Sequence, residues 1–190
     1  RMDFNHYVIE YPGMFSIAGI KPDIEIDTIF SIRSFPYERI LGTSIIYDYL
    51  KYMPLDDFIE TYELEPFMVK TQSIDRTFID KVFALCDYYL QGKTTECSRH
   101  LYDIYKLYPL ISDGLTIKRL AKETRAERMN SPFCESADPK NDINGILQKI
   151  ADSDYYKKDY ENNTSVLLYD NVDYNEAKTI LWKIIDSKEF

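Results

Sequence analysis

The chain has 190 residues, of which 45% are hydrophobic, and its formal net charge is −9. This length and hydrophobic content suit one domain, or one core with a lobe, and the negative charge argues against a surface that binds nucleic acid nonspecifically. The three cysteines form no C-x-x-C pair and there are only two histidines, which argues against zinc and favours a reducing cytoplasm. No signal peptide or long apolar run indicates export or a membrane span.

The first 72 residues are predicted to form a small β-sheet with one helix. Residues 4–11 and 23–30 alternate large apolar side chains with mostly polar ones, which is typical of half-buried strands. Residues 37–52 carry apolar side chains at helical spacing and predict an amphipathic helix. Residues 54–65 predict an acidic connector with a short helical turn, and residues 66–73 predict a third strand.

Three acidic residues, Asp23, Glu25 and Asp27, follow one face of the second predicted strand, while Ile24 and Ile26 follow the other. Carboxylates in such a row repel one another unless water or a cation separates them. Two interpretations are open: a solvent-facing edge strand, or a strand face that binds a divalent metal.

From residue 73 onward the pattern is nearly all helical. A first helix is predicted to begin at a Thr77 cap and to end at Gly92, because its apolar side chains recur at spacings of three and four. A second helix is predicted to begin near Ser98 and to end at Pro109.

Each of these two helices carries an unusual polar cluster. Lys81 lies one turn into the first, and Arg99, His100 and Asp103 share one turn of the second. The spacing alone is equally typical of a surface ion pair between Arg99 and Asp103, a structural histidine and a solvated lysine. We expect Lys81 and Asp103 to face each other if the cluster is a site.

Three further helices are predicted to complete a C-terminal helical bundle: one over residues 115–129, one over residues 143–160 and a final one capped by Asp173. The helix at 115–129 is basic, which fits either a solvated, salt-bridged face or a surface that contacts phosphate or RNA. The fold class is therefore α+β, with a small α/β portion at residues 1–72 and a helical domain at residues 73–190.

Two motifs in these helices resemble those of a known family. Arg76-Thr77-Phe78 followed by Lys81, and then Ser98-Arg99-His100 followed by Tyr102-Asp103-Ile104, resemble the nucleotidyltransferase AbiEii/AbiGii toxin family. The resemblance implies that residues 1–72 are a partial nucleotidyltransferase-like α/β portion. Weaker similarities on either side, such as Asp159-Tyr160, extend the resemblance over nearly all 190 residues.

The resemblance implies a nucleotidyltransferase toxin of a toxin–antitoxin or abortive-infection system. It would transfer a nucleotide from an NTP with Mg²⁺, would act on tRNA in some members, and would be neutralised by an antitoxin. Lys81 and Asp103 are then the catalytic residues and Asp27 the metal ligand. The resemblance assigns substrate binding to Arg76, Arg99 and His100.

Two parts that such an enzyme needs are missing from these residues. No Gly-Ser turn followed by a D-x-D pair precedes Asp27, and the chain begins Arg1-Met2 rather than with methionine. We therefore expect a truncated chain or a degenerate family member, inactive as it stands. The alternative is a non-catalytic helical module of the same fold that binds a partner protein.

Overall fold

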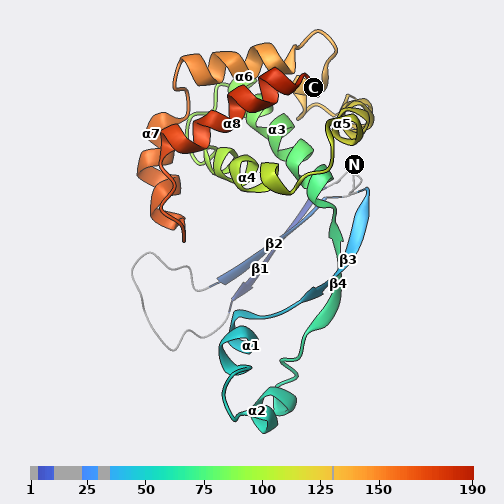
Figure 1. Ribbon diagram of the computed structural model, residues 1–190, viewed down its shortest axis with the longest axis vertical. Helices are drawn as coiled ribbons and strands as arrows, with labels where there is room; N and C mark the ends of the chain where they lie inside the picture. The colour runs from blue at the N-terminus through green and yellow to red at the C-terminus, as the bar shows by residue number, and fades with distance from the viewer. Residues whose placement is uncertain (1–3, 11–22, 30–34, 130) are drawn as a thin grey trace.

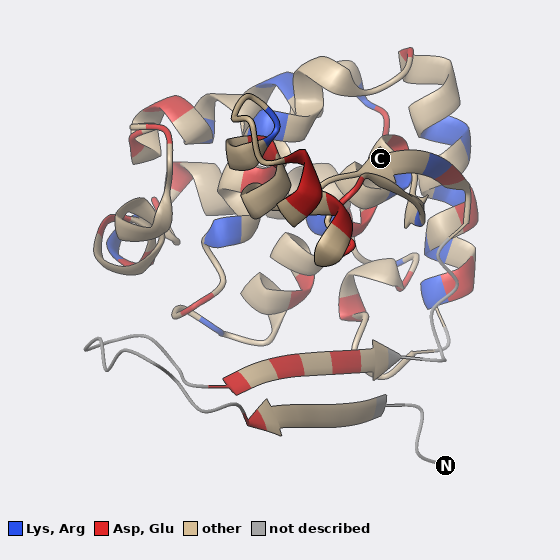
Figure 2. Cartoon of the chain, turned by 90° about the horizontal axis from the view of Figure 1, so that it is seen from below, with Lys and Arg blue, Asp and Glu red and all other residues tan. Residues whose placement is uncertain are grey.

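The computed structural model describes residues 4–10, 23–29, 35–129 and 131–190. Strand β1 (Phe4–Glu10) pairs antiparallel with strand β2 (Asp23–Ile29). His6 lies opposite Asp27, and Val8 lies opposite Glu25. The predicted alternation is thus confirmed, because the three acids of β2 share one face of this hairpin, and Figure 2 shows them as red bands along the strand. Tyr11 and Phe30, the predicted strand ends, lie outside the described residues.

A second hairpin forms an arm, defined here as residues 37–72. Strand β3 (Tyr37–Gly42) pairs antiparallel with strand β4 (Phe67–Gln72), and helices α1 (Ile45–Leu50) and α2 (Asp56–Thr61) lie between them. Among the described residues the strands therefore make two separate two-stranded sheets rather than one.

The helix predicted over residues 37–52 is wrong in its first half, which is strand β3. The pairing with β4 decides the structure there, and that long-range partner leaves no mark on the local spacing of apolar side chains. Gly42 ends the strand, and Ser44 then caps α1 by accepting a hydrogen bond from the backbone N–H of Tyr47 at 2.9 Å. The predicted strand at residues 66–73 and the short turn at residues 54–65 are confirmed as β4 and α2.

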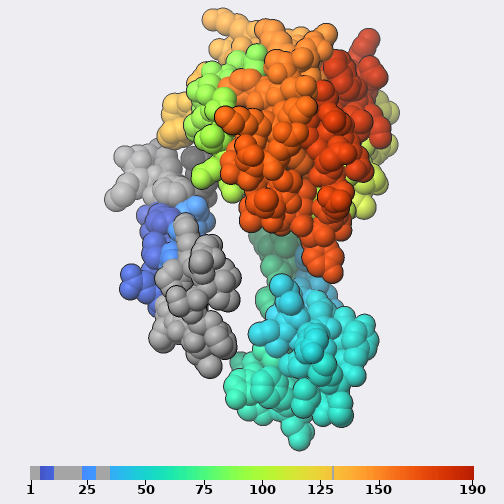
Figure 3. Space-filling view, turned by 90° about the vertical axis from the view of Figure 1, so that its left-hand side faces the viewer, coloured from blue at the N-terminus to red at the C-terminus, as the bar shows by residue number. Residues whose placement is uncertain are grey.

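The arm projects away from the helices and buries little (Figures 1 and 3). No residue of α1 is buried, and Ile59 is the one buried residue of α2. Large apolar side chains of the arm lie in solvent, among them Ile45 at 89% and Tyr52 at 85% exposed. The folding energy of the molecule must therefore come mainly from elsewhere.

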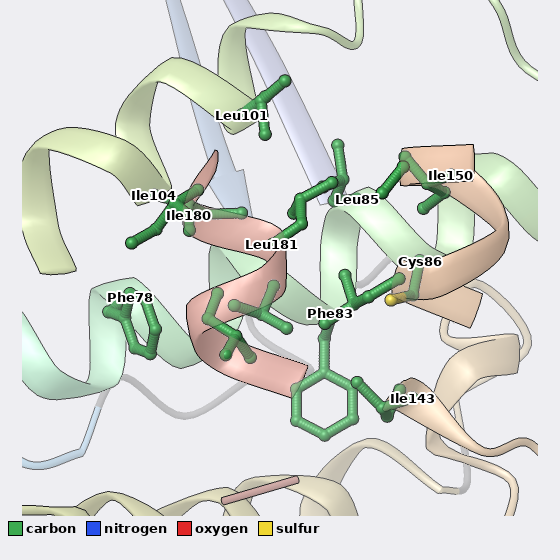
Figure 4. Close-up of a cluster of buried hydrophobic side chains, with 14 of the residues drawn as sticks. Phe78, Phe83, Leu85, Cys86, Leu101, Ile104, Ile143, Ile150, Ile180 and Leu181 are labelled. Carbon is green, nitrogen blue, oxygen red and sulfur yellow. The ribbon is translucent and has the colours of Figure 1, made fainter. Parts of the chain in front are cut away.

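The helical body, residues 74–187, holds the core. It consists of α3 (Ile74–Leu90), α4 (Arg99–Leu107), α5 (Gly114–Arg128), α6 (Ile143–Asp152), α7 (Lys157–Asp159) and α8 (Tyr174–Ser187). One-turn helices lie at Tyr108–Leu110, Glu135–Ala137 and Ser165–Leu167, and a π-helical turn lies at Tyr160–Thr164. Helix α3 is central, because α4, α5 and α6 all pack against it, and α8 closes the core over α4 and α6 (Figure 4).

Two helix boundaries differ from the prediction. Helix α3 begins one turn earlier than expected, because Ser73 rather than Thr77 is its N-cap and accepts a hydrogen bond from the backbone N–H of Arg76 at 3.2 Å. The single helix predicted over residues 143–160 stops at Asp152, since Asp154 adopts a left-handed conformation with φ of 50°. Gly92, Ser98 and Asp173 mark helix ends as predicted.

The α+β fold class is confirmed, with small sheets followed by a helical region. The division at residues 72 and 73 falls between β4 and α3 and stays a prediction. None of the described helices has the length and apolar character that crossing a membrane requires. The three cysteines are free and buried.

Candidate functional site

Lys81 and Asp103 meet across two packed helices. Lys81 lies in α3 and Asp103 in α4, and Lys81 Nζ is 2.8 Å from Asp103 Oδ2. The two side chains are 32% and 33% exposed, so water and a ligand reach both. The structure thus brings together the two residues to which the motifs assign catalysis.

His100 borders the same carboxylate from within α4. Its side chain is 9% exposed, and its ring stacks on that of Tyr88 with centroids 5.5 Å apart. His100 Nδ1 is 3.6 Å from Asp103 Oδ2 and has no hydrogen-bond partner among the described residues. Burial raises the pKa of Asp103, but His100 and Lys81 outweigh burial and hold that pKa below its ordinary value. Asp103 is therefore ionised at neutral pH.

Arg99 lies one turn before Asp103 and points into solvent. It forms no hydrogen bond or ion pair with another residue of the described chain. It lines a depression of about 400 Å³ together with residues that include Asn162, Asn163 and Leu167. Arg99 is thus a free cation beside the site rather than the partner of Asp103.

Asp159 holds the start of α4 in place. Its carboxylate accepts hydrogen bonds from the backbone N–H groups of Glu96 at 2.8 Å, Cys97 at 3.1 Å and Ser98 at 2.8 Å. The Asn163 side chain donates a fourth, at 2.7 Å. Because Ser98 makes no side-chain cap of its own, a residue more than sixty positions away orients the helix that carries His100 and Asp103. In the sequence, Asp159 stands out only by a weak family similarity, and nothing in the local pattern indicates this contact.

Arg76 lies apart from this group, buried at 1% exposure. Its guanidinium donates to Asp80 from Nε at 3.2 Å, to the Phe35 carbonyl from Nη1 at 2.7 Å and to Glu127 from Nη2 at 2.9 Å. Arg128 donates to the same Asp80 carboxylate at 2.9 Å. These bonds tie α3 to α5 and to the entrance of the arm, so substrate binding by Arg76 stays a prediction that would need one of them to open.

Asp27 is paired rather than free. His6 Nδ1 lies 2.7 Å from Asp27 Oδ1, and both side chains are about half exposed. Within the described ranges, no three His, Cys, Asp or Glu side chains converge as a metal site would require. Mg²⁺ needs oxygen ligands in near-octahedral geometry, and Asp27 offers one carboxylate, so these residues do not by themselves fit the ion.

Chemically, the Lys81–Asp103 pair can hold one positive charge at a fixed, accessible point. A lysine ammonium is a compact point charge that suits phosphate oxygens, and the Asp103 carboxylate at 2.8 Å holds it in one orientation. The unpaired Arg99 adds a second cation nearby. The arrangement suits binding of a phosphate-bearing substrate.

Comparison with known proteins gives one match. No curated protein and no solved structure matches the chain. The family model described as "Nucleotidyl transferase AbiEii toxin, Type IV TA system" matches residues 1–181, which include Asp27, Lys81 and Asp103. The chain therefore belongs to the AbiEii nucleotidyl transferase toxin family of type IV toxin–antitoxin systems.

Proposed function

We propose that the protein is a toxin that transfers a nucleoside monophosphate from an NTP to an acceptor hydroxyl, with release of pyrophosphate and with tRNA as the acceptor class. The observation that carries this proposal is the 2.8 Å contact between Lys81 and Asp103 in a chain of this family. We place the activity in the cytoplasm, where buried free cysteines stay reduced, and expect an antitoxin to neutralise it.

In this proposal Lys81 binds the triphosphate and Asp103 positions Lys81. The ammonium offsets charge on the phosphate oxygens, which is the main form of catalysis in phosphoryl-type transfer. Arg99 supplies a further cation. The His100 ring, which stacks on Tyr88, borders the Asp103 carboxylate and limits its movement. Mg²⁺, with Asp27 as one ligand, would neutralise further phosphate charge, but its other ligands would have to come from outside the described residues.

We further propose that the 190 residues are inactive by themselves. No Gly-Ser turn and D-x-D pair precede Asp27, and positioning of the triphosphate supplies most of the acceleration in such reactions. The test compares this chain with a version extended by a segment that carries both elements. Each is incubated with α-labelled NTPs, Mg²⁺ and total tRNA, and label in RNA is counted. We expect label only with the extended version.

Within the extended version, Lys81→Ala and Asp103→Asn should each lower labelling by about a hundred-fold or more. Lys149→Ala is the matched control, because Lys149 lies in α6 and its exposed side chain forms no hydrogen bond or ion pair with another described residue. It should stay within about two-fold of the parent. Labelling by the 190-residue chain that Lys81→Ala abolishes would refute the inactivity. No labelling by either version would favour the non-catalytic interaction module.

A further inference from the structure

Helix α5 carries three cations that the fold does not use. Lys118, Arg119 and Lys122 are exposed, and none forms a hydrogen bond or an ion pair with another described residue. Since an α-helix turns about 100° per residue, these three side chains lie within about 100° of one another around its axis. They form what we call the α5 stripe. Figure 2 shows the blue bands that recur along this helix at one side of the body.

The opposite side of α5 is committed to the fold. Ile117, Leu120, Ala121 and Thr124 are buried against the core. Arg128 forms an ion pair with Asp80 at 2.9 Å, and Glu127 accepts a hydrogen bond from Arg76. Because stability draws on these contacts and not on the stripe, the stripe cations are free to meet a ligand.

The surroundings favour an extended anion over a small one. Lys118 and Lys122 line a depression of about 220 Å³ with Arg125, while Arg119 lines a separate one of about 350 Å³ with Arg76. Glu189 borders the first depression, and Asp75, Glu123 and Glu127 border the second. The stripe cations thus lie at two separate depressions rather than converging on one point, and acids at both disfavour a single small anion, so the arrangement suits successive phosphates of a chain that passes over the exposed cations.

The charge of the rest of the molecule directs such a ligand to α5. The net charge is −9, and the tip of the arm carries five acids without a lysine or arginine between residues 54 and 65: Asp56, Asp57, Glu60, Glu63 and Glu65. A polyanion is repelled there and attracted to the stripe. Helix α5 packs on α3, the helix that holds Lys81, so stripe and site belong to one packed unit.

We infer that the α5 stripe is a docking surface for the phosphodiester backbone of the nucleic acid acceptor. The role as acceptor surface rests on the proposed function, whereas binding itself does not. Contacts to the RNA backbone depend on charge and spacing rather than on base sequence. The stripe would therefore position the RNA on the toxin, and the Lys81–Asp103 site would select the end that is modified.

The test measures binding without NTP or Mg²⁺. Fluorescein-labelled total tRNA is titrated with the protein, and the dissociation constant is followed by anisotropy over a range of salt concentrations. The triple variant K118A/R119A/K122A should bind about ten-fold or more weakly, and the slope of log K against log salt should shrink by about 2 units, since each lost phosphate contact removes about 0.7 on single strands. Alanine favours helix, so the melting temperature should stay within about 3 °C of the parent.

The matched control removes the same charge elsewhere. K149A/K158A/K183A removes three exposed lysines, from α6, α7 and α8, whose side chains form no hydrogen bond or ion pair within the described chain. It should stay within about two-fold of the parent. Equal weakening by both triple variants, or none by the stripe variant, would overturn the inference. The inference would also be overturned if a poly-glutamate peptide, added at the same total charge as the RNA, displaced the RNA, because the stripe would then be a surface for an acidic protein.

Lys81→Ala separates this inference from the proposed function. That variant should bind RNA as the parent does, since Lys81 lies outside the stripe. RNA binding that depends on the stripe, in an extended protein that transfers no nucleotide, would refute the enzyme and keep the surface. Transfer to RNA that is insensitive to the stripe variant would keep the enzyme and refute the surface.

Discussion

Asp80 lies between two guanidinium groups, with Arg76 Nε at 3.2 Å and Arg128 Nη2 at 2.9 Å. Removing one member of a buried ion pair leaves an uncompensated charge that costs several kcal/mol, so these residues act together to join α3 and α5. The spacing of Arg76 and Asp80 by four is visible in the sequence, but Arg128 arrives from 48 positions further on. The sequence motif thus singles out Arg76, but the acceptors of its guanidinium hydrogen bonds are known only from the fold.

Asp159 is the buried carboxylate with the clearest dependence on pH. Burial raises its pKa, but the hydrogen bonds from Asn163, Ser98 and the Glu96 backbone outweigh burial and lower the pKa to about 2. An unfolded aspartate titrates near pH 4, roughly. The carboxylate therefore contributes stability above about pH 4, and this stability, about 2 kcal/mol, is lost as the pH falls toward about 2.

Replacing Asp159 with Asn should remove this contribution. The variant should be less stable than the parent by about 2 kcal/mol at pH 7, and the difference should shrink as the pH falls toward about 2. Urea unfolding followed by circular dichroism between those pH values measures it. Asp152→Asn is the control, because Asp152 is exposed and holds no helix start. A stability difference that is independent of pH would show that the charge of Asp159 is not what matters.

Among the helices and strands, the local sequence pattern predicted correctly that α3 is a helix but placed its first residue one turn too late. Thr77 followed by Asp80 resembles a capping box, yet Ser73 is the cap, and Thr77 Oγ1 instead donates to the Ser73 carbonyl at 2.9 Å. Ser73 is buried, and Asp75 lies in the first turn of α3. The β3 strand could not be found this way, because its partner β4 is far along the chain. The Lys81–Asp103 contact could be predicted because both motifs sit beside the apolar faces that pack α3 on α4.

The position of the cap can be tested by a pair of substitutions. Ser73→Ala should lower the free energy of unfolding by about 1 kcal/mol, since it leaves the Arg76 N–H without its acceptor. Thr77→Ala should cost less than about half of that, because the Thr77 hydroxyl bonds a carbonyl within the helix and alanine is the better helix former. Thermal unfolding of both variants decides it. A larger loss of unfolding free energy for Thr77→Ala than for Ser73→Ala would show that Thr77, as the sequence first indicated, is the N-cap.

For the whole molecule, the contrast between arm and body predicts uneven stability. The buried hydrophobic cluster lies wholly between Phe78 and Ile184, within the helical body, whereas β3 and α1 bury no residue. Regions with few buried contacts open at low cost. Amides of β3 and α1 should therefore exchange with solvent about a hundred-fold faster or more than those of α3 and α8.

Hydrogen exchange read by mass spectrometry on the intact chain measures this difference. The same data address the division at residues 72 and 73, because a boundary in protection should fall between β4 and α3. Equal protection of the arm and the body would show that the arm is held by contacts beyond those described and that the chain opens as one unit.

The bond network of Asp159 also bears on how the toxin is made. Synthesis runs from the N-terminus, and α4 has no side-chain cap until Asp159, 61 positions after Ser98, can reach it. A growing chain that has passed Lys81 and Asp103 therefore carries both residues but not yet the fixed helix that orients them. Ribosomes that stall or abort before residue 159 release fragments with an unanchored α4, and the cell that encodes the toxin meets an anchored α4 only after residue 159 has been translated.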